Sequence, residues 1–97
     1  MNTTFDHIAS VIIKDQAQVL GSFAWDEAAL VKDLRIVDRK TGNVEITANA
    51  DYGKVIDELV NHYVELFGRA AREACREAAA PLLTQIPANE VPLSLKK

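Results

Sequence analysis

The feature that most constrains this fold is a long stretch of helical periodicity in the second half of the chain, from about Tyr52 to Ala80. At about 100° per residue, its apolar side chains fill one continuous arc of roughly 200°, about twice the stripe of an ordinary surface helix. The arc contains Tyr52, Val55, Ile56, Leu59, Val60, Tyr63, Val64, Leu66, Phe67, Ala70, Ala71 and Ala74. One continuous helix of about 29 residues would be ~43 Å long. Pro81 ends this helix or lies just beyond it.

Such a helix needs cover on two sides and is longer than a compact domain of 97 residues, whose radius of gyration would be about 12.5 Å. The remaining elements are too small to cover it. The pattern therefore predicts that a second copy completes the core, most simply in a homodimer. Small residues in the second half of the helix would let two backbones approach closely. The expected interface residues are Val60, Tyr63, Val64, Phe67, Ala70, Ala71 and Ala74.

An N-terminal helix is predicted from Thr4 to about Leu20. Thr3 and Asp6 form a capping-box pattern, in which each side chain satisfies a free backbone N–H at a helix start. Gly21 can end the helix. The next segment, Phe23 to Lys32, has no clean apolar stripe, so it is either a short separate helix or a bent continuation of the first.

A β-hairpin is predicted between these helical regions. Apolar and polar residues alternate over Leu34–Asp38 and again over Val44–Ala48. In the linking turn, Gly42 or Asn43 can adopt a positive φ at little cost. Two short alternating runs joined by such a turn indicate an antiparallel pair. The predicted class is α+β, with one or two N-terminal helices, one hairpin and one long C-terminal helix.

We predict one domain over residues 1–83 and an extended C-terminal arm over residues 84–97. Pro87 excludes a continuing helix, and Pro92 excludes a central strand. Val91, Leu93 and Leu95 lie on one side of an extended chain. We expect the arm to dock on its own dimer or on another protein, the alternative being a frayed chain end.

Composition argues against several functions. The net charge is −3, from 11 basic and 14 acidic residues in mixed order, and no one-sided basic face for nucleic acid is visible. No apolar run approaches the ~20 residues of a membrane span. The N-terminal residues lack the pattern of a signal peptide. A single cysteine excludes an intrachain disulfide and fits a reducing compartment, so we expect a cytoplasmic protein.

No catalytic residue, metal site or cofactor is predicted. Cys75 and His62 lie 13 positions apart on the predicted helix, about 20 Å along its axis, so they could not meet within one subunit. We interpret Cys75 as an ordinary half-buried thiol. The histidines and acidic residues lack the spacing of metal ligands, and no glycine-rich phosphate loop is present.

The leading hypothesis is a non-enzymatic homodimeric interaction or regulatory module. The alternative is a small-molecule sensor or carrier with an apolar pocket between the helices and the hairpin. Trp25, Tyr52 and Tyr63 would supply the polar tips of that pocket. Trp25 is the residue that the pattern does not place: it lies in the core, or else it is the best candidate for a ligand contact. An enzyme with a site across the dimer is the third hypothesis.

Overall fold

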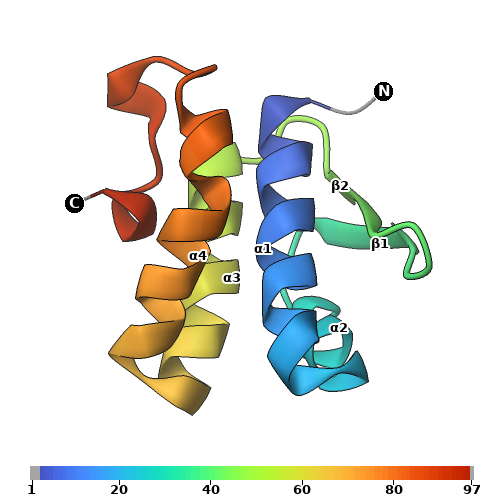
Figure 1. Ribbon diagram of the computed structural model, residues 1–97. Coiled ribbons are helices and arrows are strands. Elements are labelled where there is room, and N and C mark those ends of the chain that lie inside the picture. Colours follow the sequence, from blue (N-terminus) through green and yellow to red (C-terminus); the bar gives the residue numbers. More distant parts are fainter. Residues whose placement is uncertain (1–2, 97) are drawn as a thin grey trace.

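Four α-helices and one two-stranded antiparallel hairpin make up residues 3–96, the part of the chain that the computed structural model describes (Figure 1). Two short 3-10 turns, η1 and η2, follow the last helix. The chain is therefore a small α+β domain. In chain order the elements are α1 (Thr4–Leu20), α2 (Ser22–Ala28), β1 (Leu34–Asp38), β2 (Asn43–Ile46), α3 (Tyr52–Phe67), α4 (Arg69–Leu83), η1 (Ala88–Glu90) and η2 (Leu93–Leu95).

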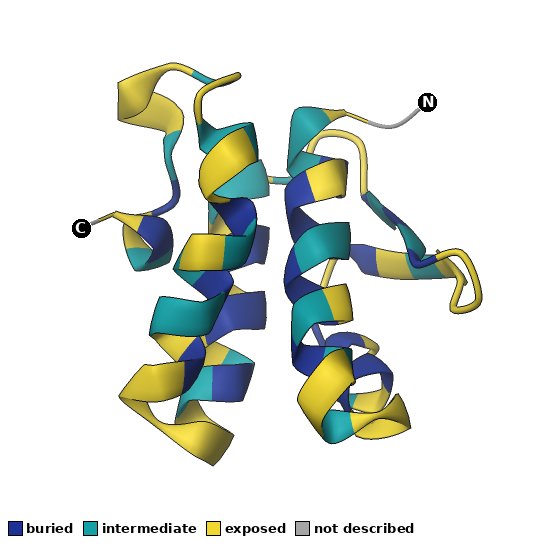
Figure 2. Ribbon diagram, viewed as in Figure 1, coloured by how far each residue is buried: buried dark blue, intermediate teal, exposed yellow. Residues whose placement is uncertain are grey.

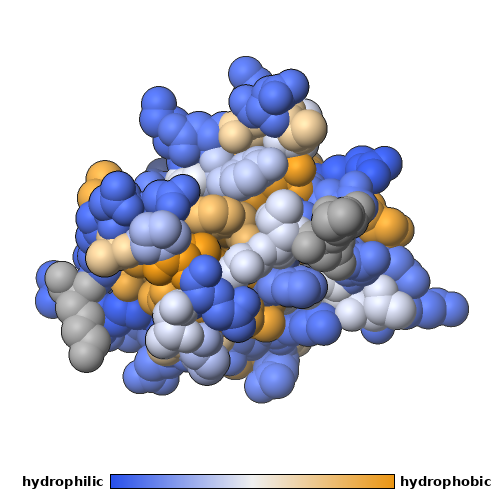
Figure 3. All heavy atoms as spheres, turned by 90° about the horizontal axis from the view of Figure 1, so that it is seen from above, coloured by the Kyte–Doolittle hydropathy of each residue, from blue (hydrophilic) through white to orange (hydrophobic). Residues whose placement is uncertain are grey.

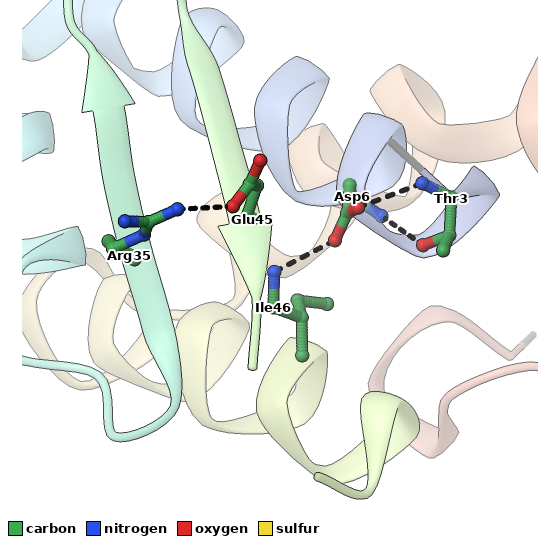
Figure 4. A network of polar contacts seen from close by, with 5 residues as sticks. All are labelled: Thr3, Asp6, Arg35, Glu45 and Ile46. Carbon is green, nitrogen blue, oxygen red and sulfur yellow. Dashed lines mark hydrogen bonds and ion pairs between the residues drawn. The ribbon is translucent and has the colours of Figure 1, made fainter. Parts of the chain in front are cut away.

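Helix α1 begins at the predicted capping box, which also joins the helix to the hairpin (Figure 4). The Thr3 hydroxyl accepts the Asp6 backbone N–H at 3.2 Å, and Asp6 Oδ2 accepts the Thr3 N–H at 2.8 Å. The other carboxylate oxygen, Oδ1, accepts the backbone N–H of Ile46 at 2.8 Å. Asp6 is buried, so these bonds satisfy a carboxylate that would otherwise be costly to desolvate. The segment after Gly21 forms a separate helix, α2.

The residues of both strands that the alternation predicts to face inward do face the core, except for Ala48, which was expected to face inward but is exposed and lies beyond the end of β2. Leu34 pairs with Ile46 and Ile36 pairs with Val44, and the register shifts between Ile36 and Asp38. Leu34, Val44 and Ile46 are buried, while Ile36 is half-buried. On the outer face, Arg35 and Glu45 form a cross-strand ion pair, which lowers the pKa of the Glu45 carboxyl (Figure 4). The second strand ends at Ile46, two residues before the predicted end.

The prediction of one long C-terminal helix is wrong. Gly68 has φ 76° and ψ −164°, a conformation essentially restricted to glycine, and it separates α3 from α4. The two helices fold back on each other, and α1 packs against both (Figure 1). The chain therefore measures only 31 × 29 × 21 Å, which removes the length argument for a second copy. Pro81 lies inside α4, which continues to Leu83.

The wide apolar arc is covered within the single chain. Figure 2 shows that the faces which α1, α3 and α4 turn toward one another are buried. Tyr63 of α3 and Cys75 of α4 are completely buried, and Trp25 of α2 is only 8% exposed. The core is otherwise mostly aliphatic. Its other members include Ile8, Ile12, Ile13, Ile56, Leu59, Val60 and Ala79.

The C-terminal arm docks on its own chain. It forms two 3-10 turns, in place of the predicted extended conformation, and η2 packs against both α3 and α4. Leu95 is 2% exposed. Arg72 Nε donates to the carbonyl oxygen of Ser94 at 3.0 Å, and Asp57 accepts hydrogen bonds from the same serine. The arm thus covers the side of the α3–α4 pair that α1 leaves open.

Candidate functional site

The three residues predicted to bind a ligand lie in three different places. Tyr63 is sealed in the core, where its hydroxyl donates to the Ala24 carbonyl oxygen at 2.8 Å and links α3 to α2. Burial raises the pKa of this hydroxyl above its ordinary value. Tyr63 is thus a core residue and has no access to a ligand. Tyr52 and Trp25 line two separate pockets.

Tyr52 lies where α1 and α3 begin. Its ring packs against that of Phe5, with 5.4 Å between the ring centroids. Both line an open pocket of about 390 Å³ beneath the arm, whose walls carry charges of both signs, including Lys54, Asp57 and Glu90. Viewed from this end, apolar side chains occupy the middle of the face and hydrophilic side chains surround them (Figure 3). The mixed charge indicates no single class of ligand.

The residues predicted to form the dimer interface do not share one surface. The fold buries three of them in the core of a single chain, leaves two half-buried and exposes the other two. The buried residues are Val60, Tyr63 and Ala71, the half-buried ones are Val64 and Ala74, and the exposed ones are Phe67 and Ala70. Of the exposed pair, only Phe67 is a large apolar side chain.

Phe67 belongs to an exposed apolar cluster that the sequence did not reveal. The corner between α1 and α2 and the corner between α3 and α4 lie at the same end of the molecule (Figure 1). There Phe23 and Phe67 pack edge to face, with 6.4 Å between ring centroids and 89° between ring planes. Phe23 remains 42% exposed, Leu66 47% and Phe67 44%. We call Phe23, Leu66 and Phe67 the apolar end.

The structure also defines the setting of the cysteine and histidine. Cys75 and His62 lie on different helices, so their predicted separation along one helix does not apply. Cys75 is fully buried, and burial, with a smaller effect of the Asp15 charge, raises its pKa to about 12. The Nδ1 atom of His62 lies 3.4 Å from a carboxylate oxygen of Glu27. A protonated, buried thiol is poorly suited to nucleophilic attack.

Within residues 3–96, no cluster of three or more histidine, cysteine or acidic side chains has the arrangement of a metal site. None of the helices in that range combines the length and hydrophobicity required to span a bilayer. Comparison with protein-family models, with curated proteins and with solved structures gives no match for this chain. The exposed features that remain as candidate sites are the apolar end and the pocket beside Trp25.

Proposed function

We propose that this protein is a non-enzymatic interaction module that forms a homodimer through the apolar end. The observation that carries the proposal is the pair of Phe23 and Phe67, which pack against each other and still leave about two-fifths of each side chain exposed. Aromatic residues are enriched among the side chains that contribute most to protein–protein binding. A second copy would remove both rings and Leu66 from water.

The charges beside the apolar end favour a second copy of the same chain as the partner. Glu65 and Arg69 are both exposed and flank Leu66 and Phe67 in the sequence, Glu65 before them and Arg69 after them. In a two-fold dimer the same patch meets itself. Glu65 of one copy can then approach Arg69 of the other, and the reverse pair forms by symmetry. The charges beside the apolar end are therefore compatible with a two-fold dimer, because opposite charges can pair across its axis and like charges need not meet.

The chemistry of the chain supports a binding role over a catalytic one. The single cysteine is buried with a raised pKa, and the half-buried His62 has a carboxylate neighbour, Glu27. Nucleophilic catalysis would need an accessible nucleophile within reach of a base.

Sedimentation equilibrium from about 1 µM to 1 mM tests the proposal, because a patch of this size should give a dimer of modest affinity. The native chain should approach twice its 10.7 kDa mass as the concentration rises. Phe23→Ser and Phe67→Ser should each weaken the dimer by about tenfold or more, as expected for hot-spot aromatic residues. Val37→Ser is the matched control, since Val37 is 47% exposed on β1.

Two results would overturn the proposal. One is a native chain that remains monomeric over the whole range. The other is a dimer whose affinity is unchanged by both phenylalanine substitutions. Circular dichroism of each variant shows whether the fold is retained, which is expected because both side chains are partly exposed.

A further inference from the structure

The pocket beside Trp25 lies where three elements meet. It has a volume of about 340 Å³ and lies between α1, α2 and the turn of the hairpin. Lys14 reaches it from α1, Trp25 from α2, and Arg39 and Lys40 from the turn. The sequence patterns left Trp25 either in the core or at a ligand contact. The fold brings these residues to one site.

The turn is held against α1 by contacts that position its basic side chains. The Ser10 hydroxyl donates a hydrogen bond to the carbonyl oxygen of Gly42. Gly42 has φ 76°, and a Cβ atom there would lie 2.0 Å from Cε of Lys14. The positive φ favours glycine, and the absence of a Cβ atom lets the Lys14 side chain lie directly against the backbone of the turn. Lys14 and Lys40 consequently line the same pocket.

The pocket is positively charged in a chain whose net charge is −3. Arg39 forms an ion pair with Asp26 at 3.1 Å, and Asp38 accepts the backbone N–H of Lys40. Within residues 3–96, neither Lys14 nor Lys40 has a carboxylate partner within ion-pair distance. Two of the three cations in the pocket are thus available to a ligand.

Trp25 supplies an apolar wall to the pocket. Its side chain is largely buried, which fixes the position of the indole ring. Within the described residues, no hydrogen bond from the indole N–H is found, and no buried side-chain nitrogen or oxygen lacks a partner. The N–H group therefore keeps some contact with solvent. A rigid aromatic wall beside convergent polar groups is typical of small-molecule sites.

We propose that this pocket binds a small molecule that joins an anionic group, a carboxylate or a phosphate, to a flat apolar ring. Lys14 and Lys40 hold the anion through charge-assisted hydrogen bonds, and Arg39 adds the positive charge of its guanidinium from the turn of the hairpin. The ring lies along Trp25 and Ala17. None of the residues that line this pocket belongs to the apolar end, so this proposal does not rest on the proposed dimer.

Trp25 is the only tryptophan, so the tryptophan signal comes entirely from a residue that lines this pocket. Benzoate and phenyl phosphate test the two anionic groups, while benzyl alcohol and benzylamine present the same ring with a neutral or positive group. The readouts are tryptophan fluorescence and the NMR shift of the indole N–H. We expect saturable changes with one or both anions and only weak, linear changes with the other two compounds.

Lys14→Gln and Lys40→Gln should each weaken binding of the anions by about tenfold, because each removes a charge-assisted hydrogen bond. Lys32→Gln is the matched control, an exposed lysine outside the pocket, and should leave the affinity unchanged. All three lysines are exposed, so the variants should fold like the native chain. The proposal would be overturned if neither anion gave a saturable change at concentrations up to about 10 mM, which corresponds to very weak binding. Equal binding of benzylamine, or equal losses in all three variants, would overturn it as well.

Discussion

Asp57 and Ser94 join the C-terminal arm to α3 through a single carboxylate oxygen. Asp57 Oδ1 accepts the backbone N–H of Ser94 at 2.9 Å and the Ser94 hydroxyl at 2.6 Å. Arg72 reaches the carbonyl oxygen of the same serine from α4. Ser94 is thereby fixed between two helices, and the two leucines beside it point to different environments.

Those leucines provide a test of arm docking. Leu95 is 2% exposed and Leu93 is 71% exposed. Leu95→Ala should lower the free energy of unfolding by about 2–5 kcal/mol, as for other buried leucines. Leu93→Ala should change it by less than about 0.5 kcal/mol. Urea denaturation measures both. If the two variants were equally stable, the arm would not belong to the folded core.

Gly68 should be essential to the corner between α3 and α4. Gly68→Ala should destabilise the fold by about 1–3 kcal/mol, because alanine rarely adopts this backbone conformation. The added Cβ meets no atom within 4 Å, so the loss is one of backbone strain alone. Gly53→Ala is the control within α3, where alanine should be neutral or stabilise by about 0.5–1 kcal/mol. A Gly68→Ala chain with native stability and a larger Stokes radius would instead favour one continuous helix.

Asp6 should contribute more to stability than an ordinary capping residue. Asp6→Ala leaves the backbone N–H groups of Thr3 and Ile46 without their acceptor, which should cost about 2–4 kcal/mol. Thr3→Ala removes the helix cap alone and should cost about 1 kcal/mol. Thermal denaturation of both variants measures the difference. Equal losses would mean that the bond from Ile46 to Asp6 adds little.

Cys75 should make the protein less stable at alkaline pH. Its pKa is raised from 9.0 to about 12 in the folded chain. Above pH 9 the unfolded chain releases the thiol proton while the folded chain retains it. The unfolded state then binds fewer protons, so stability falls with rising pH, by up to about 1.4 kcal/mol per pH unit for this group.

The comparison is between the native chain and Cys75→Ala at pH 7 to 10. The alanine variant should show the smaller decline, since Tyr63, whose pKa is also raised, is present in both. The native thiol should also react slowly with alkylating reagents at pH 7. A fast, selective reaction would show that Cys75 is more accessible and more ionised than its burial indicates.

Local signals in the sequence predicted α1 and the hairpin, although they left open whether the segment after Gly21 forms a separate helix. The Thr3–Asp6 capping box marks the start of α1, and the alternating residues with a glycine turn mark the hairpin. These features depend on neighbours in the chain. Gly68 was misread because helical periodicity continues across it: α3 and α4 bury their apolar faces in one core, so the apolar arc shows no gap.

The candidate sites were less predictable because they depend on contacts between distant residues. Phe23 and Phe67 meet only because the corners at Gly21 and at Gly68 lie at the same end of the molecule. Trp25 joins Lys14 and Lys40 only because the turn at Gly42 packs on α1. No periodicity connects these residues. The sequence did indicate Trp25 as unusual, since it lay outside every apolar stripe.

The packing of α1 against α4 has a consequence for synthesis of the chain. Most neighbouring elements can pack as they leave the ribosome, since Gly21 joins α1 to α2 and Gly68 joins α3 to α4. Helix α1 is different, because the side that packs against α4 stays exposed until α4, which begins at Arg69, has been synthesised. During that interval Ile8, Ile12 and other core side chains of α1 are incompletely covered. We therefore expect a chaperone to bind the nascent chain, or aggregation to begin, before α4 has emerged from the ribosome.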